Sequence, residues 1–155
     1  ASACRAPSDM AGEQPPQVAG TRLPGGEYRI SSAENRALCE ALLTEPAADG
    51  RAHEIYSYIA TQSGMGVTVD GLLAICEFDA ADGPMLGSSN SRFHSTLMTE
   101  VTYRVSGTIL ALTRKQSRKL GVMDVLEYRL TLESESGEPV LEVTNTWILP
   151  RRNLT

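Results

Sequence analysis

The sequence predicts a single α+β domain in which a curved antiparallel sheet is wrapped around a central helix. Two observations support this prediction. Residues 49–79 contain the longest helix-compatible apolar pattern in the chain. Residues 99–150 show the alternation of apolar and polar side chains that is typical of strands. Because an apolar helix must be covered and only these strands can cover it, we expect the sheet to curve around the helix.

Composition limits the classes of protein to consider. A chain of 155 residues with 41% hydrophobic content can bury one sizeable core. The net charge of -5 argues against general binding of nucleic acid, which requires a basic face. No apolar run approaches the roughly 18 to 20 residues of a membrane span, so we expect no membrane partner.

The cysteines and histidines do not predict a metal site. Cys4, Cys39 and Cys76 lack metal-ligand spacing, and the chain has only two histidines. Cys39 and Cys76 lie on apolar faces of predicted helices, which favours buried free thiols in a reducing, cytoplasmic compartment. We therefore expect neither a metal nor a cofactor.

The first part of the chain is predicted to be an arm. Four prolines lie within the first 26 residues and little periodic apolar content accompanies them, so residues 1–22 are interpreted as a flexible or extended arm and residues 23–155 as the folded domain. A short strand is expected over Glu27–Ile30. A helix capped by Ser31 or Ser32 then continues until Pro46 stops it.

The central stretch and the sheet follow. Gly64-Met65-Gly66 interrupts the apolar pattern, which indicates one broken helix or two short ones. Turn residues at Asp82–Pro84 and Gly87–Asn90 are expected to carry the chain to the sheet. Its strands are predicted at Val101–Thr113, Leu126–Leu132 and Leu141–Leu149, with a hairpin turn at Ser136-Gly137 and a longer basic connection over Arg114–Gly121. One face of these strands is expected to consist of Val101, Tyr103, Val105, Ile109, Leu126, Tyr128, Leu130, Leu132, Leu141, Val143, Trp147 and Leu149.

This order of elements, and the run from Phe93 to Arg151 in particular, resembles the sheet half of MaoC-like and fatty-acid-synthase-type dehydratases, which have the hot-dog fold. The resemblance covers roughly Glu27 to Arg152. It implies a homodimer that hydrates or dehydrates acyl thioesters at the 3-position, with coenzyme A or an acyl carrier protein as the carrier, in fatty acid or polyketide-type biosynthesis. The active loop of that family has the pattern Asp-x-Asn-Pro-x-His, and the matching place here holds Asp49-Gly50-Arg51-Ala52-His53, without the Asn-Pro pair.

Residue chemistry suggests roles for this loop. Removing the proton next to a thioester carbonyl requires a base, and a histidine of ordinary pKa, about 6.5, is suited to that task near neutral pH. We therefore expect His53 to act as the base and Asp49 to orient the water or hydroxyl. Free N–H groups at the start of the central helix are expected to stabilise the developing oxyanion. His94 is a second candidate acid or base, or simply a polar residue at the start of a strand.

Substrate contacts are predicted in two places. Tyr56, Gly64 and Gly66 belong to the central stretch. Arg114 and Arg118 belong to the basic connection, which is either a solvated loop or a contact for coenzyme A phosphates or an acidic carrier protein.

Two other functions remain open. Hot-dog thioesterases commonly use a carboxylate from the central helix, and Glu54, Asp70 and Glu77 are available for that role or are solvated side chains. The incomplete loop motif also fits a non-catalytic module that binds acyl thioesters or serves assembly.

Overall fold

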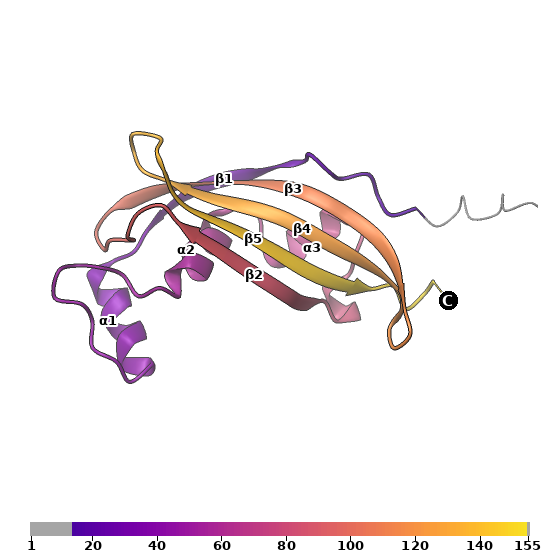
Figure 1. Ribbon diagram of the computed structural model, residues 1–155, viewed down its shortest axis with the longest axis horizontal. Helices are drawn as coiled ribbons and strands as arrows, with labels where there is room; N and C mark the ends of the chain where they lie inside the picture. Colours follow the sequence, from indigo (N-terminus) through magenta and orange to yellow (C-terminus); the bar gives the residue numbers. More distant parts are fainter. Residues whose placement is uncertain (1–13, 155) are drawn as a thin grey trace, which may run out of the picture.

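The structure is a computed structural model in which residues 14–154 are described. Its elements are β1 (Arg22–Arg29), α1 (Ser32–Ala41), α2 (Tyr56–Gly64), α3 (Val69–Ile75), a short 3₁₀ helix (Ala80–Asp82), β2 (Met85–Phe93), β3 (Thr102–Ser117), β4 (Gly121–Glu133) and β5 (Pro139–Pro150). Figure 1 shows one curved sheet that arches over α2 and α3, with α1 at one end. The strand order is β1-β3-β4-β5-β2, and every neighbouring pair is antiparallel. The predicted sheet around a central helix is confirmed.

The central stretch forms two short helices rather than one. Thr68 caps α3 by accepting a hydrogen bond from the Gly71 N–H at 3.0 Å. Between the helices, the Met65 carbonyl accepts a hydrogen bond from the Gly25 N–H at 2.9 Å, which ties the break to β1. The predicted interruption is therefore an anchoring point for the helix pair.

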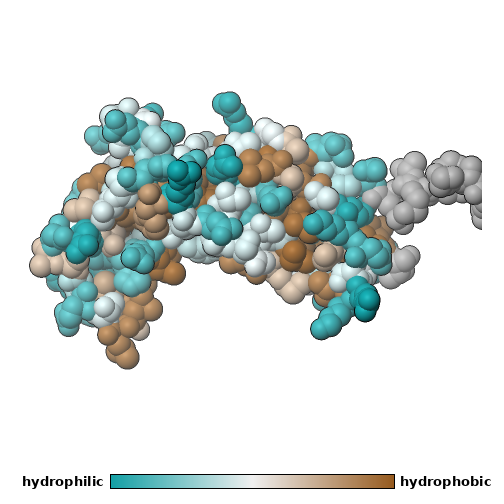
Figure 2. Space-filling view, viewed as in Figure 1, coloured by the Kyte–Doolittle hydropathy of each residue, from teal (hydrophilic) through white to brown (hydrophobic). Residues whose placement is uncertain are grey.

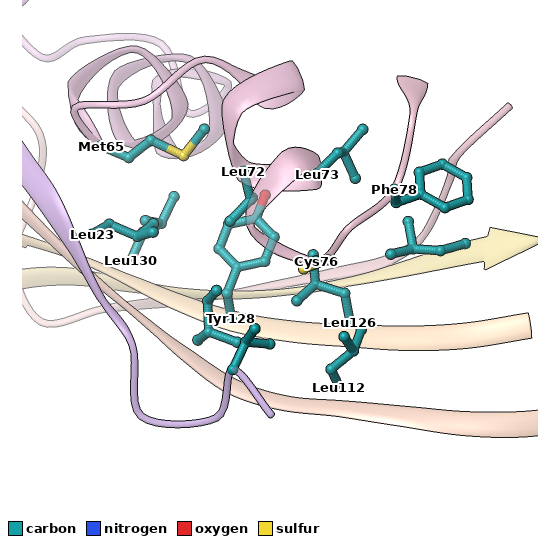
Figure 3. Close-up of a cluster of buried hydrophobic side chains, with 13 residues drawn as sticks. Leu23, Met65, Leu72, Leu73, Cys76, Phe78, Leu112, Leu126, Tyr128 and Leu130 are labelled. Atoms are coloured by element: carbon teal, nitrogen blue, oxygen red, sulfur yellow. The ribbon is translucent and has the colours of Figure 1, made fainter. Parts of the chain in front are cut away.

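The core lies between these helices and the concave face of the sheet. Leu126, Tyr128, Leu130 and Leu132 of β4 are all fully buried, as the alternation predicts. Figure 3 shows Met65, Leu72, Leu73 and Cys76 packed above side chains of the sheet. The two described cysteines, Cys39 and Cys76, are free and buried as expected.

The predicted inward face of β3 needs two corrections. Val101 precedes β3 and is 38% exposed. A bulge between Ile109 and Ala111 then shifts the alternation, so that Leu112 is buried while Leu110 is exposed. The sequence does not reveal the bulge because both leucines suit either face.

Gly87–Asn90 was predicted to be a turn and instead lies inside β2, which pairs with β5 along its length. The ladder with β5 overrides the weak strand propensity of Gly, Ser and Asn. All nine residues of β2 are exposed, so the hydrophobic pattern could not mark the strand. The basic connection is also shorter than predicted, because β3 continues to Ser117 and β4 begins at Gly121.

The described part of the arm lies against the sheet. The Gly20 N–H donates to the Ile109 carbonyl at 2.8 Å, and Val18 is buried in the core. Residues 1–13 of the predicted arm lie outside the described residues. Among residues 14–154, no helix has the length and apolar character needed to cross a membrane.

A buried ion cluster joins the sheet to the helices at the end far from α1. Asp124 is fully buried, and its carboxylate accepts hydrogen bonds from Arg114 Nε at 2.8 Å and Arg151 Nε at 2.7 Å. Arg151 also donates to the carbonyls of Cys76 and Glu77, just after α3. Burial opposes ionisation of Asp124, but the two arginines outweigh it and lower the pKa of the carboxyl.

We predict that Asp124→Asn lowers the free energy of unfolding at pH 7 by about 3–5 kcal/mol, because it leaves two arginines without their buried counter-charge. The native pKa lies below the unfolded value of about 3.9, so the stabilisation is present above pH 4 and is lost as the pH falls through the native pKa. Urea unfolding at several pH values measures both effects. The exposed Glu135→Gln in the β4–β5 hairpin is the control, with an expected change within about 0.5 kcal/mol. Equal effects of the two variants would contradict the prediction.

Candidate functional site

A cavity of about 580 Å³ lies where α1, the loop before α2 and the segment after β2 meet. Apolar and ionisable side chains share its wall, which suits a ligand with both an apolar and a polar part. The lining consists of Asn35, Cys39, Glu45, Ala47, Arg51, Ala52, His53, Glu54, Phe93, His94, Ser95, Thr96 and Leu97. Among the described residues, no group of histidine, cysteine and carboxylate side chains is arranged to hold a metal ion.

Backbone pairing brings the two distant loops together. The Ala52 N–H donates to the Leu97 carbonyl at 2.9 Å, and the Thr99 N–H donates to the Gly50 carbonyl at 2.8 Å. Arg51 and Met98 form the antiparallel bridge between these bonds. This short pairing is the reason that His53 and His94 line the same cavity.

Hydrogen bonds fix the conformation of His53. Its backbone N–H donates to Oδ1 of the buried Asn35 at 2.9 Å. Its ring atom Nδ1 accepts the Ile55 N–H at 3.1 Å, and its carbonyl accepts the Tyr56 N–H at 3.1 Å. His53 is therefore held by α1 on one side and by the start of α2 on the other.

The expected free N–H groups at the start of α2 are already used. Ile55 and Tyr56 donate to His53, while the Ser57 N–H donates to the Glu54 carbonyl at 3.0 Å. The prediction that this helix end offers these N–H groups to an oxyanion is wrong, because the His53 turn satisfies them locally.

Asp49 does not line the cavity. Its exposed carboxylate pairs with Arg51, with 2.9 Å between Oδ2 and Nε. The hydrogen bonds from the Arg51 side chain and backbone lower the pKa of Asp49. The structure therefore places Asp49 as the partner of Arg51 and not beside a ligand in the cavity.

His94 has a carboxylate partner. Its Nε2 lies 2.7 Å from Oε2 of Glu142, and the contact is an ion pair when the imidazole is protonated. Glu142 alternates with the buried Leu141 and Val143, so it lies on the outer face of β5. The hydrogen bond from His94 is the main cause of the lowered pKa of Glu142. His94 thus borders the cavity while its Nε2 is engaged on the other face of the sheet.

Tyr56 is buried beneath the surface, outside the cavity lining. Burial and the nearby Glu34 carboxylate raise the pKa of Tyr56. Tyr28 donates to Glu34 Oε1 at 2.7 Å, and burial together with this bond raises the pKa of Tyr28 to about 12. Burial opposes ionisation of Glu34, but the hydrogen bonds from Tyr28 and Ser31 outweigh it and lower the pKa of Glu34. These groups join α1, α2 and β1 behind the cavity.

Gly64 and Gly66 serve packing in this structure. A Cβ on Gly64 would overlap the Val105 side chain. Gly66 has φ +83, and a Cβ there would overlap the backbone of Gly25. Both glycines let the break between α2 and α3 approach the sheet, and neither lines the cavity.

The predicted arginines lie far from the cavity within this chain. Arg114 belongs to the buried cluster with Asp124. Arg118 lies in the β3–β4 hairpin, at the end of the sheet opposite α1 (Figure 1). Of the carboxylates considered for a thioesterase, Glu54 lines the cavity, whereas Asp70 and Glu77 are exposed in the α3 region.

Asn35 and Glu45 are cavity residues that the sequence did not indicate. Asn35 lies four residues before Cys39, so the two share one face of α1, and both are buried. This spacing was the only signal for Asn35. Glu45 lies in the loop after α1 and carried no signal.

We predict that Gly66→Ala lowers the free energy of unfolding by at least about 3 kcal/mol, because it combines a left-handed backbone with a clash against the Gly25 backbone. Gly121→Ala is the matched control, since Gly121 has φ +67 and open space around it. Its expected cost is about 1–2 kcal/mol. Thermal and urea unfolding measure the difference, and equal losses would refute the packing role.

No protein-family model and no curated protein matches this sequence. Solved structures do match. The ChsH1-ChsH2 complex from Mycobacterium tuberculosis aligns with TM-score 0.64 and 15% identity over 83% of this chain and 88% of that one. The C-terminally truncated HadBC (3R-hydroxyacyl-ACP dehydratase) complex from the same organism aligns with TM-score 0.61 and 14% identity over 85% and 98%. A mutant hypothetical thioesterase protein from Streptococcus pneumoniae aligns with TM-score 0.51 and 12% identity over 79% and 78%.

These similarities and the topology establish the class of the protein by its architecture. The chain has the α+β hot-dog fold, as a single domain, and this prediction is confirmed. Its structural neighbours include a dehydratase and a hypothetical thioesterase.

Proposed function

We propose that this protein hydrates or dehydrates an acyl thioester, with an enoyl or 3-hydroxyacyl group bound in the His53 cavity. The observation that carries the proposal is the position of His53, held at the start of α2 on the wall of a cavity of about 580 Å³. The fold is shared with a 3R-hydroxyacyl-ACP dehydratase, which supports the same substrate class. The acyl group is carried by coenzyme A or an acyl carrier protein.

The chemistry requires polar groups beside an apolar surface. Dehydration removes a proton from the carbon next to the thioester carbonyl and the hydroxyl from the third carbon, and the two leave as water. The cavity supplies ionisable side chains at His53, Glu45 and Glu54. Phe93 and Leu97 supply apolar surface for the acyl chain.

We expect the purified protein to convert enoyl thioesters without releasing thiol, and His53→Ala to lower kcat/KM by about 100-fold or more. The measurement is a panel of enoyl and saturated acyl thioesters, in which enoyl absorbance and free thiol are followed together. Glu135→Gln, an exposed residue outside the cavity lining, is the control and should keep wild-type rates.

Hydrolysis is the second candidate, because the fold also occurs in a hypothetical thioesterase protein and Glu45 and Glu54 line the cavity. Thiol release that depends on either carboxylate would replace the hydratase proposal with this one. Binding of thioester without turnover would indicate a non-catalytic module.

We further propose that two copies associate through β2. An open edge strand leaves backbone N–H and C=O groups unpaired, and apolar side chains on it favour association. Every residue of β2 is exposed, including Met85 at 41% and Leu86 at 45%. Figure 2 shows further apolar surface at the free end of α1, where Leu42 and Leu43 are exposed.

We predict that the protein is a dimer and that the double variant Met85→Glu, Leu86→Glu is a monomer, because like charges would meet across the paired edges. Sedimentation equilibrium or light scattering measures the mass. Leu110→Glu on β3 is the control, because Leu110 has similar exposure but lies away from the β2 edge. A monomeric wild type, or an unchanged mass of the double variant, would contradict association through β2.

A further inference from the structure

The hydrogen bonds of the His53 ring determine which of its nitrogens carries the proton in the neutral form. The Ile55 N–H points at Nδ1 across 3.1 Å. An accepting ring nitrogen must keep its lone pair, so the proton of the neutral ring is on Nε2. The opposite tautomer would direct two N–H groups at each other across the same distance.

The surrounding turn opposes a ring rotation that would exchange the accepting Nδ1 with the donating Nε2. Asn35 holds the His53 N–H, and Tyr56 donates to the His53 carbonyl, so the backbone is fixed on both sides of the ring. Rotation of the side chain would leave the Ile55 N–H without its acceptor. Within residues 14–154, no protein group is seen to bind Nε2, which is therefore the polar atom of His53 left for a ligand.

A thioester carbonyl in this cavity would need a hydrogen-bond donor. The N–H groups of Ile55, Tyr56 and Ser57 are already used within the turn. Arg51, a cationic side chain in the lining, is 59% exposed and binds Asp49 through Nε. Within this turn, Nε2–H of His53 is a side-chain donor that lies in the cavity lining and has no partner among residues 14–154.

We infer that His53 acts as a hydrogen-bond donor to the carbonyl oxygen of the thioester, through Nε2–H, and not as the base that the sequence suggests. The identity of the ligand rests on the proposed function. The tautomer rests on the geometry of the His53 turn alone. As water adds to the enoyl group, the electron pair moves towards the carbonyl oxygen, and Nε2–H stabilises the charge that develops there.

The proton balance then uses a carboxylate. In hydration, Glu45 or Glu54 takes a proton from water as the new C–O bond forms at the third carbon. The resulting carboxylic acid returns that proton to the second carbon when the enolate collapses. The net change is the addition of one water molecule, and His53 keeps its proton throughout.

The first test is independent of turnover. Long-range ¹H–¹⁵N correlation of the ¹⁵N-labelled protein at about pH 8, where an ordinary imidazole is neutral, distinguishes the two tautomers. The spectrum of His53→Asn assigns the His53 signals. We expect Nε2 protonated and Nδ1 unprotonated, and a shift of the Nε2–H signal when crotonyl-coenzyme A is added. A dominant Nδ1–H form, an even mixture of tautomers or an unmoved signal would overturn the inference.

The second test uses two amide variants, each of which replaces one of the two ring nitrogens. An asparagine oxygen can accept the Ile55 N–H two residues ahead but offers nothing at the position of Nε2. A glutamine amide N–H reaches that position. For a donor, we expect His53→Gln to stay within about tenfold of the wild-type kcat/KM and His53→Asn to lose about 100-fold or more.

Equal large losses in both variants, with unchanged unfolding temperatures, would overturn the donor role and restore the base. If His53→Gln has a lowered unfolding temperature, KM and kcat are measured at a temperature where the variant is folded. A loss of stability is then not mistaken for a chemical effect. Absence of turnover in the wild type would remove the proposed function. The tautomer and the shift on addition of crotonyl-coenzyme A would still decide whether Nε2–H is a donor.

Discussion

The packing of α2 and α3 against the concave face of β4 is the contact on which the rest of the structure depends. Every inward side chain of β4 from Leu126 to Leu132 is fully buried, and burial of that many apolar groups is the main favourable term in folding. The packing also requires a close approach at the helix break, where Gly64 and Gly66 leave no room for a side chain. Gly64 and Gly66, which the sequence analysis expected to contact substrate, are therefore constrained by the core.

The cavity lies at the end of the sheet where α1, the loop before α2 and the segment after β2 meet. Two backbone hydrogen bonds between the loops near Gly50 and Leu97 close its wall, and the Asn35 amide fixes His53 from the helix α1. The backbone of His53 is thereby fixed by α1, its ring by the Ile55 N–H of its own turn, and the preceding Ala52 by the loop at Leu97. Such preorganisation lets a donor act without the cost of ordering it when the ligand binds.

The sequence predicted the parts of the fold that carry a strong hydrophobic period. The inner faces of β4 and β5 and the broken central helix are examples. It missed β2, because a strand exposed along its whole length has no apolar alternation, and its Gly, Ser and Asn residues read locally as a turn. Of the residues that line the cavity, the sequence indicated only some. His53 followed from a motif and lines the cavity. Asp49 instead pairs with Arg51, two residues away, and the Nε2 of His94 pairs with Glu142 of β5, a tertiary contact that the local sequence does not indicate.

The structure explains why Asp49 stays outside the cavity in a loop that departs from the Asp-x-Asn-Pro-x-His pattern. The loop has one residue fewer between Asp49 and His53 than the pattern, and it contains Arg51. The Asp49 carboxylate pairs with this adjacent guanidinium and remains exposed to solvent. The carboxylate of Asp49 is then absent from the cavity lining, whose acidic groups are Glu45, earlier in the same loop, and Glu54. In the inferred mechanism, the two roles are divided between different side chains. His53, whose Nδ1 accepts a backbone N–H, donates from Nε2 to the oxygen where charge develops, and a glutamate transfers the proton.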